Sequence, residues 1–145
     1  QYIIYSNKIY DRKHLLFARG KLRALQKGAI TMAIIASEHI DAEKRFGGNG
    51  TIHIQKLLTP AELNGKCGMY ARVTIPPHAS MGLHRHEGNT ETYHILSGHA
   101  RYNDNGKEME IGSGTTTFCA DGEVHAIENI SDTEDLVFMA LIINQ

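Results

Sequence analysis

GLHRHEGNTETYHILSG, residues 82–98, places two histidines one residue apart and continues through a turn into a run that contains Glu91. Because successive side chains of a β-strand point to opposite faces, His84 and His86 share one face, roughly 7 Å apart along the chain. The Gly-Asn pair that follows them is typical of a turn. If the chain reverses there into a hairpin, His86 lies opposite Glu91. In the same register His84 lies opposite Tyr93, so two imidazoles and one carboxylate converge.

These three side chains form most of a metal site, because imidazole and carboxylate together suit Mn, Fe, Ni, Cu or Zn. A histidine pair on an exposed strand can also be no more than a solvated polar face. Three ligand groups in register argue against that interpretation, and a further histidine follows downstream. In GTTTFCADGEVHAIEN, residues 114–129, His125 lies in a predicted strand with Ile127 and Asn129 on the same face. His125 is therefore a fourth candidate ligand.

Short runs with the length of β-strands follow one another from residue 51 to the end of the chain. Turn signals rich in Gly, Asn, Asp and Ser separate most of them. The predicted strands are residues 51–57, 69–75, 91–96, 99–103, 107–111, 115–119, 124–129 and 135–143. Short strands at regular spacing indicate an all-β sandwich or barrel. The pair Asn105-Gly106 predicts a two-residue hairpin loop, which places Arg101 opposite Glu110 and Tyr102 opposite Met109.

The first part of the chain differs in charge and pattern from the rest. Residues 1–31 hold seven Lys/Arg and one Asp, whereas the following residues hold eight Lys/Arg and fifteen Asp/Glu. A loose apolar stripe predicts a helix over residues 11–30. We expect a basic, partly helical extension over residues 1–47 that packs on the rest of the chain or on a second copy. Nucleic-acid binding is not expected, because basic and aromatic residues do not interleave.

Other features of the sequence indicate the cellular compartment in which the protein is expected. No apolar run approaches the roughly 18 residues that span a bilayer, and the first residues do not form a secretory signal. The two cysteines, Cys67 and Cys119, lie far apart, which fits reduced thiols better than a disulfide. We therefore expect a cytoplasmic protein that does not bind membranes.

Both regions around the histidines resemble the cupin superfamily. The first cupin signature, G-x-H-x-H-x4-E-x6-G, is matched by Gly82, His84, His86, Glu91 and Gly98. The second, G-x5-P-x-G-x2-H-x3-N, is matched by Gly114, Gly122, His125 and Asn129. Ala120 stands where the family usually has proline, at a turn position rather than a ligand position. The resemblance covers residues 48–145.

The resemblance implies an all-β cupin jelly-roll (double-stranded β-helix) barrel over residues 48–145 that holds one divalent transition metal. The implied ligands are His84, His86, Glu91 and His125. Manganese or iron is the expected metal, with zinc, nickel and copper as alternatives. The resemblance also implies a homodimer and a small-molecule ligand. The residues before and through the first signature are similar to small single-domain cupins described as oxalate-binding or oxalate-decarboxylase-like.

Two residues are candidates for a catalytic role beside the metal. Tyr93 shares the predicted ligand face and could orient a substrate or simply pack, and His78 lies in the loop before the first signature. In the strand at residues 69–75, every second side chain should line the barrel, and the sequence does not determine which set points inward. If Arg72 points inward, it can anchor a carboxylate; if it points outward, it is solvated. His94 has the opposite parity to Glu91, so we expect it to point away from the site.

Two functions remain open from the sequence. The first is metal-assisted chemistry on a small carboxylate or carbonyl compound, by decarboxylation, dioxygenation or isomerisation. Oxalate decarboxylases usually carry an arginine three residues before the first ligand histidine, where this chain has Met81. The second is metal-dependent binding of a small ligand without turnover, which needs no general acid or base. A sugar-binding sensor domain of a transcription regulator is a third class, but residues 1–47 are too short and irregular for a helix-turn-helix.

Overall fold

The computed structural model describes three stretches of the chain, residues 3–5, 8–10 and 34–145. The chain divides into two compact units, Gln1–Ile34 and Ile35–Gln145. In the first unit, β1 (Ile3–Tyr5) pairs antiparallel with β2 (Lys8–Tyr10). The helix expected over residues 11–30 lies outside the described residues. No helix in the described part of the chain is long and apolar enough to cross a membrane.

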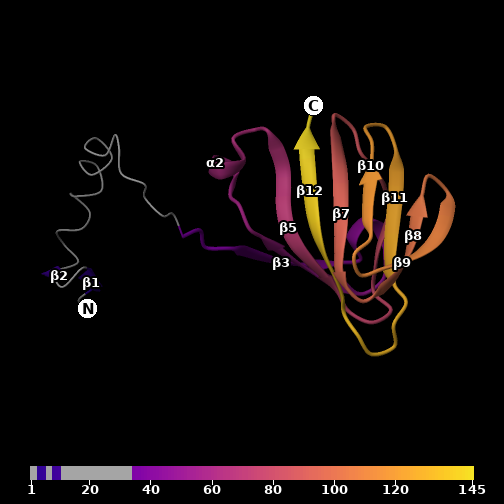
Figure 1. The fold of residues 1–145 in the computed structure, drawn as a ribbon, viewed down its shortest axis with the longest axis horizontal. Helices are drawn as coiled ribbons and strands as arrows, with labels where there is room; N and C mark the ends of the chain where they lie inside the picture. The colour runs from indigo at the N-terminus through magenta and orange to yellow at the C-terminus, as the bar shows by residue number, and fades with distance from the viewer. Residues whose placement is uncertain (1–2, 6–7, 11–33) are drawn as a thin grey trace. The chain divides into compact units, whose positions relative to one another are not determined.

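The second unit is built from two antiparallel sheets (Figure 1). One sheet has the strand order β10 (Thr116–Cys119), β7 (Asn89–Ser97), β12 (Leu136–Asn144), β5 (Cys67–Ile75), β4 (Thr51–Lys56) and β3 (Glu38–Glu43). The other has the order β6 (Ser80–Arg85), β11 (Val124–Asn129), β8 (His99–Asp104) and β9 (Lys107–Gly112). Two short helical turns, η1 (Arg45–Gly47) and α2 (Pro60–Leu63), join strands of the larger sheet. This architecture confirms the expected all-β jelly-roll.

The hairpin of β8 and β9 has the register expected from its loop. Arg101 pairs with Glu110 and Tyr102 with Met109 along the backbone. The loop residues Asn105 and Gly106 both have positive φ, 50° and 89°, as a tight two-residue hairpin turn requires. The side chain of Arg101, however, binds Glu128 of β11 on its other side, at 2.7 Å.

Strand β3 is the edge strand of the larger sheet, and it precedes the boundary expected at residue 48. It pairs with β4 so that Ile40 lies opposite Ile54. The compact unit accordingly begins at Ile35, and residue 48 falls in the loop between these two strands. The sequence of this strand, EHIDAE, has no clear apolar alternation, because β3 is at the edge of the sheet. Ile40 and Ala42 are its two partly buried residues, and the other four are exposed.

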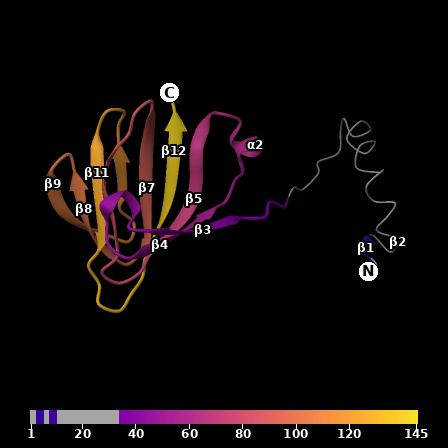
Figure 2. The same ribbon diagram turned by 180° about the vertical axis from the view of Figure 1, so that it is seen from behind.

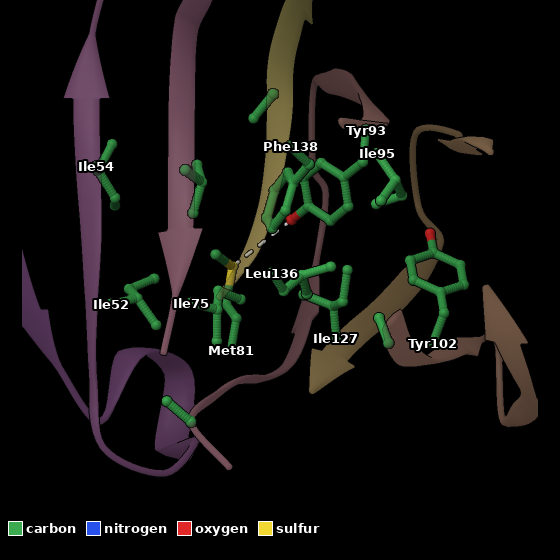
Figure 3. Close-up of a cluster of buried hydrophobic side chains, with 14 of the residues drawn as sticks. Ile52, Ile54, Ile75, Met81, Tyr93, Ile95, Tyr102, Ile127, Leu136 and Phe138 are labelled. Atoms are coloured by element: carbon green, nitrogen blue, oxygen red, sulfur yellow. Dashed lines mark hydrogen bonds between the residues drawn. The ribbon is translucent and has the colours of Figure 1, made fainter. Parts of the chain in front are cut away.

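The core fills the space between the sheets with inward side chains from both. Ala71, Val73 and Ile75 are buried, so this parity of β5 lines the barrel. Arg72 consequently points outward and is exposed, which removes it as an anchor inside the barrel. Figure 3 shows this cluster of buried apolar side chains and labels Ile52, Ile54, Ile75, Met81, Tyr93, Ile95, Tyr102, Ile127, Leu136 and Phe138. At about 0.8 kcal/mol per buried methylene, this apolar cluster is the main source of stability.

A shortened chain that begins at Met32 tests whether the barrel folds by itself. It keeps the whole compact unit that starts at Ile35, so we expect it to fold and to bind metal like the full chain. Its Tm should agree within roughly 4 °C, the shift produced by less than 1 kcal/mol in a domain of this size. Circular dichroism melts and elemental analysis of both chains measure this. An insoluble or metal-free product would show that the removed residues are needed for the domain to fold or to bind metal.

Candidate metal centre

The structure brings together His84, His86, Glu91 and His125, the four residues that the cupin resemblance implied as ligands. His84 lies near the end of β6, and His86 follows that strand directly. Glu91 comes from the start of β7 and His125 from the start of β11. One potential ligand atom of each residue lies within 4.8 Å of those of the others.

The hairpin predicted between the two histidines and Glu91 is wrong. Strand β6 pairs with β11, where His84 lies opposite His125. Strand β7 belongs to the other sheet and pairs with β10 and β12. The turn at Gly88, which has a φ of 72°, therefore carries the chain across the barrel instead of back along the same sheet. The ligands still converge, because the two sheets face each other across the interior.

The distances between the potential ligand atoms match a single bound ion. Nε2 of His125 lies 3.0 Å from Nε2 of both His84 and His86. Oε2 of Glu91 lies 3.1 Å from His125, 3.2 Å from His86 and 3.7 Å from His84. Ligands bound at about 2.0–2.2 Å to one metal are separated from one another by about this spacing. All four side chains are at most 8% exposed, so water competes little for their lone pairs.

The other ring nitrogen of each histidine is held by an oxygen. The Nδ1 partners are the Gly82 carbonyl at 2.9 Å for His84, the Asn89 amide oxygen at 2.6 Å for His86 and the Tyr102 hydroxyl at 2.9 Å for His125. Burial raises the pKa of Tyr102 to about 12, so its hydroxyl stays neutral. A proton on each Nδ1 leaves the Nε2 lone pair free, the arrangement that metal-binding histidines adopt. With the protons on Nδ1, three Nε2 lone pairs face one another at this range, which is a donor set that fits a divalent metal.

The negative charge of Glu91 also favours a cation at this site. Burial favours its neutral form, but hydrogen bonds to the three histidine rings, His125 first, outweigh burial and hold the Glu91 pKa well below its usual range. Burial lowers the pKa of His125, which favours the neutral ring that a metal needs. The hydrogen bond to Glu91 raises the pKa of His86. Glu91 is thus a buried carboxylate surrounded by three imidazole rings, a donor set that suits a divalent metal.

Tyr93 lies beside the cluster as a hydrogen-bond donor. Its side chain is 1% exposed, and its ring stacks on His125 with centroids 4.9 Å apart. Figure 3 shows its hydroxyl directed at the sulfur of Met81, 3.6 Å away. Burial, and then the negative charge of Glu91, raise the pKa of Tyr93 well above its usual value. Tyr93 therefore keeps its proton at neutral pH and cannot serve as a general base.

The structure does not bring His78 to the cluster. It precedes Ser80, the first residue of β6, whereas His84 lies near the other end of that strand. Its Nε2 lies 3.0 Å from Asp132, and both side chains are largely exposed, at 62% and 88%. His78 is close to the ligands in sequence but not in space, because an extended strand adds roughly 3 Å or more per residue between them. His94 is exposed and bonds to Thr116 at 2.9 Å, away from the ligands as expected.

A cavity of about 90 Å³ adjoins the ligands. Besides His84, His86, Glu91 and Tyr93, its lining includes Arg45, Phe46, Ile54, Met69, Met81 and Ile142. Arg45 and Phe46 were not predicted as site residues, and they lie in the segment assigned to the extension. Nothing in the local pattern marks them, because they reach the cavity only through the packing of η1 on β6.

Comparison with known proteins agrees with this architecture. A family model described as a cupin domain matches residues 71–142. An oxalate-binding protein of Thermotoga maritima is 40% identical over 116 residues, which cover 78% of this chain and 95% of that protein. The chain belongs to the cupin family.

Solved cupin structures show the same fold. The crystal structure of a predicted oxalate decarboxylase from Thermotoga maritima is 38% identical, with a TM-score of 0.70 over 81% of this chain and 100% of that one. An RmlC-like cupin from Shewanella frigidimarina has a TM-score of 0.61 over 83% of this chain and 96% of that one. Its identity is only 13%, so that likeness shows the fold alone.

The departure of this cupin from the second signature has a local explanation. Ala120 stands where the family usually has proline, and its backbone N–H donates to the carboxylate of Glu123 at 2.8 Å. The Glu123 N–H in turn donates to the Ala120 carbonyl at 3.1 Å. A proline has no N–H to donate. Two reciprocal bonds thus stabilise the turn before β11, which carries His125, by another route.

Proposed function

We propose that this cupin binds a small carboxylate such as oxalate at a divalent metal held by His84, His86, Glu91 and His125. The observation that carries the proposal is the convergence of three Nε2 atoms and one carboxylate oxygen beside a cavity of about 90 Å³. The oxalate-binding protein of Thermotoga maritima, 40% identical, supports the choice of ligand. We propose manganese or iron as the metal, because mixed imidazole and carboxylate donors suit both, with zinc, nickel and copper as alternatives.

Charge explains why an anion suits this site. A divalent metal, when bound, supplies two positive charges, of which Glu91 cancels one. The three imidazoles are neutral as ligands, so the centre keeps one positive charge. Ile54, Met69 and Ile142 form an apolar wall that limits competition by water and strengthens attraction to an anion. The small volume admits only a small ligand.

The same lining favours binding over turnover. Among the described residues that line the cavity, apart from the ligands, Tyr93 and Arg45 are the two that carry an ionisable group. Tyr93 keeps its proton, and an arginine is always charged. Neither can accept a proton at neutral pH as general base catalysis requires. Enzymatic decarboxylation is the second candidate, and its support is the likeness to the predicted oxalate decarboxylase of known structure.

Calorimetric titration of the manganese-loaded and metal-free protein with oxalate tests the proposal. We expect about one oxalate per loaded chain, and an affinity at least tenfold weaker, about 1.4 kcal/mol, without metal. In parallel, oxalate and its products are quantified by NMR after incubation with and without O2. Unchanged oxalate supports a binding protein, whereas its consumption selects the enzyme. Equal affinity of the loaded and metal-free protein would contradict a role for the metal in binding.

A further inference from the structure

The turn η1, between β3 and β4, places two side chains at the metal cavity. Arg45 and Phe46 both line it. The Phe46 ring stacks on His84, with centroids 4.1 Å apart and an interplanar angle of 15°. The guanidinium carbon of Arg45 lies 4.3 Å from the centre of the Phe46 ring. A continuous set of contacts thus links an arginine to a metal-ligand residue through one phenyl ring.

The backbone of this turn is strained. Lys44 and Phe46 have φ values of 47° and 52°, in the left-handed region that side-chain-bearing residues rarely occupy. A bulky aromatic residue in this conformation costs free energy and persists only where the surroundings impose it. Such strain concentrates at ligand-binding positions. Here it directs one face of the Phe46 ring onto His84, while the residue as a whole stays 46% exposed.

The surroundings that impose this conformation are provided by β6. A Cβ atom at Gly82 would collide with the Phe46 carbonyl oxygen, and one at Gly48 would collide with the Ser80 carbonyl oxygen. The backbones of the turn and the strand therefore lie in direct contact. The Asn49 N–H donates to the Ser80 hydroxyl at 2.8 Å, and the Ser80 N–H donates to the Asn49 carbonyl at 2.8 Å. Figure 2 shows the purple turn beside the barrel strands. The turn is thus seated on the strand that carries the first ligand.

Among residues 34–145, no carboxylate pairs with the charge of Arg45. Within residues 34–145, no Asp or Glu oxygen lies within 4.0 Å of its guanidinium, whereas Arg101 binds Glu128 at 2.7 Å. The Arg45 guanidinium lies over the face of the Phe46 ring, and the residue is otherwise exposed to solvent. A guanidinium offers a planar pair of N–H donors that matches both oxygens of a carboxylate.

We propose that Arg45 is a specificity-determining residue that binds a carboxylate group of the ligand, and that Phe46 holds its guanidinium in place. The ligand class is a small dicarboxylate, with one carboxylate directed to the His/Glu cluster and the other to Arg45. A monocarboxylate makes only the first of these contacts. This inference rests on the proposed function and adds to it the choice between these two classes of acid.

Calorimetric titration of the manganese-loaded full chain with oxalate and with acetate tests the inference. We expect Arg45→Met to weaken oxalate binding at least tenfold and acetate binding less than threefold, differences that correspond to about 1.4 and below about 0.7 kcal/mol. Arg45→Lys should fall between, because an ammonium keeps the charge but loses the paired donors. Arg72→Met, an identical change at an exposed position on the outer face of the sheet, should bind both acids like the wild type. Manganese content is measured for every variant.

The outcomes separate this inference from the function beneath it. If the loaded wild type binds neither acid, the proposed function fails and the inference fails with it. If the wild type binds oxalate and Arg45→Met binds it equally well, the inference alone is overturned. An equal loss for oxalate and acetate also overturns it, because Arg45 then acts on the site as a whole. If Arg45→Met is unstable, the oxalate-to-acetate ratio of Arg45→Lys decides: a lowered ratio supports the inference and an unchanged ratio overturns it.

Discussion

The double variant His84→Ala/His86→Ala is expected to lose its metal completely, whereas the wild-type chain, purified without a metal-chelating column, holds about one manganese or iron ion. The variant keeps one imidazole and one carboxylate of the four converging groups. Two ligands in a buried site do not compensate an ion for its lost hydration. Elemental analysis of both proteins measures the number of metal ions per chain.

Removal of the metal from the wild type by a chelator should lower its Tm by roughly 10–15 °C. A ligand present at a hundred times its Kd adds about 2.7 kcal/mol to the free energy of unfolding, and this contribution is lost with the metal.

The matched control is His94→Ala/His99→Ala, which removes the same number of imidazoles from exposed positions of the barrel. It should keep the wild-type metal content, which excludes loosely bound metal on surface histidines as the source of the signal. The prediction fails if the wild type contains no metal and takes up none on titration. The cupin signatures would then mark only the fold, and both metal-dependent functions would have to be abandoned.

Local patterns were sufficient to predict most strands of the barrel, whereas the full set of four ligands was implied by the cupin resemblance. Strand alternation depends on nearest neighbours, and the loop at Asn105-Gly106 sets its own hairpin register, so both could be read without a structure. The convergence of His84, His86 and Glu91 was also predictable, although by a wrong hairpin. Any arrangement that buries one face of each strand directs these side chains inward, whether the strands share a sheet or face each other.

What could not be predicted depends on contacts between distant segments. Strand β3 has a weak pattern because it is an edge strand, and it becomes part of the barrel only through pairing with β4. Arg45 and Phe46 reach the metal cavity because Gly82 admits their backbone, a contact that spans more than thirty residues. His78 shows the opposite case, since it is near His84 in sequence and yet bonds to Asp132, away from the ligands.

Asn129, the last residue of the second signature, illustrates a position whose role only the structure reveals. Its side chain is completely buried and makes three hydrogen bonds at once. The Nδ2 group donates to the carbonyls of Ile75 and Glu134, both at 2.8 Å. The Oδ1 atom accepts from the Ser131 N–H at 3.0 Å. This one amide therefore joins the end of β5 to the loop that leads into β12, and it does not contact the metal cluster.

We expect Asn129→Ala to lower the free energy of unfolding by about 3 kcal/mol, because each lost hydrogen bond costs about 1 kcal/mol and leaves a buried backbone group unpaired. In a domain of this size that loss lowers the Tm by roughly 12–20 °C. Asn144→Ala is the matched control, since that exposed side chain donates one bond to the Gly65 carbonyl, and it should cost less than about 1 kcal/mol. Below its Tm the Asn129 variant should keep the wild-type metal content. A variant that melts like the wild type but loses its metal would assign Asn129 to the metal site instead of to the fold.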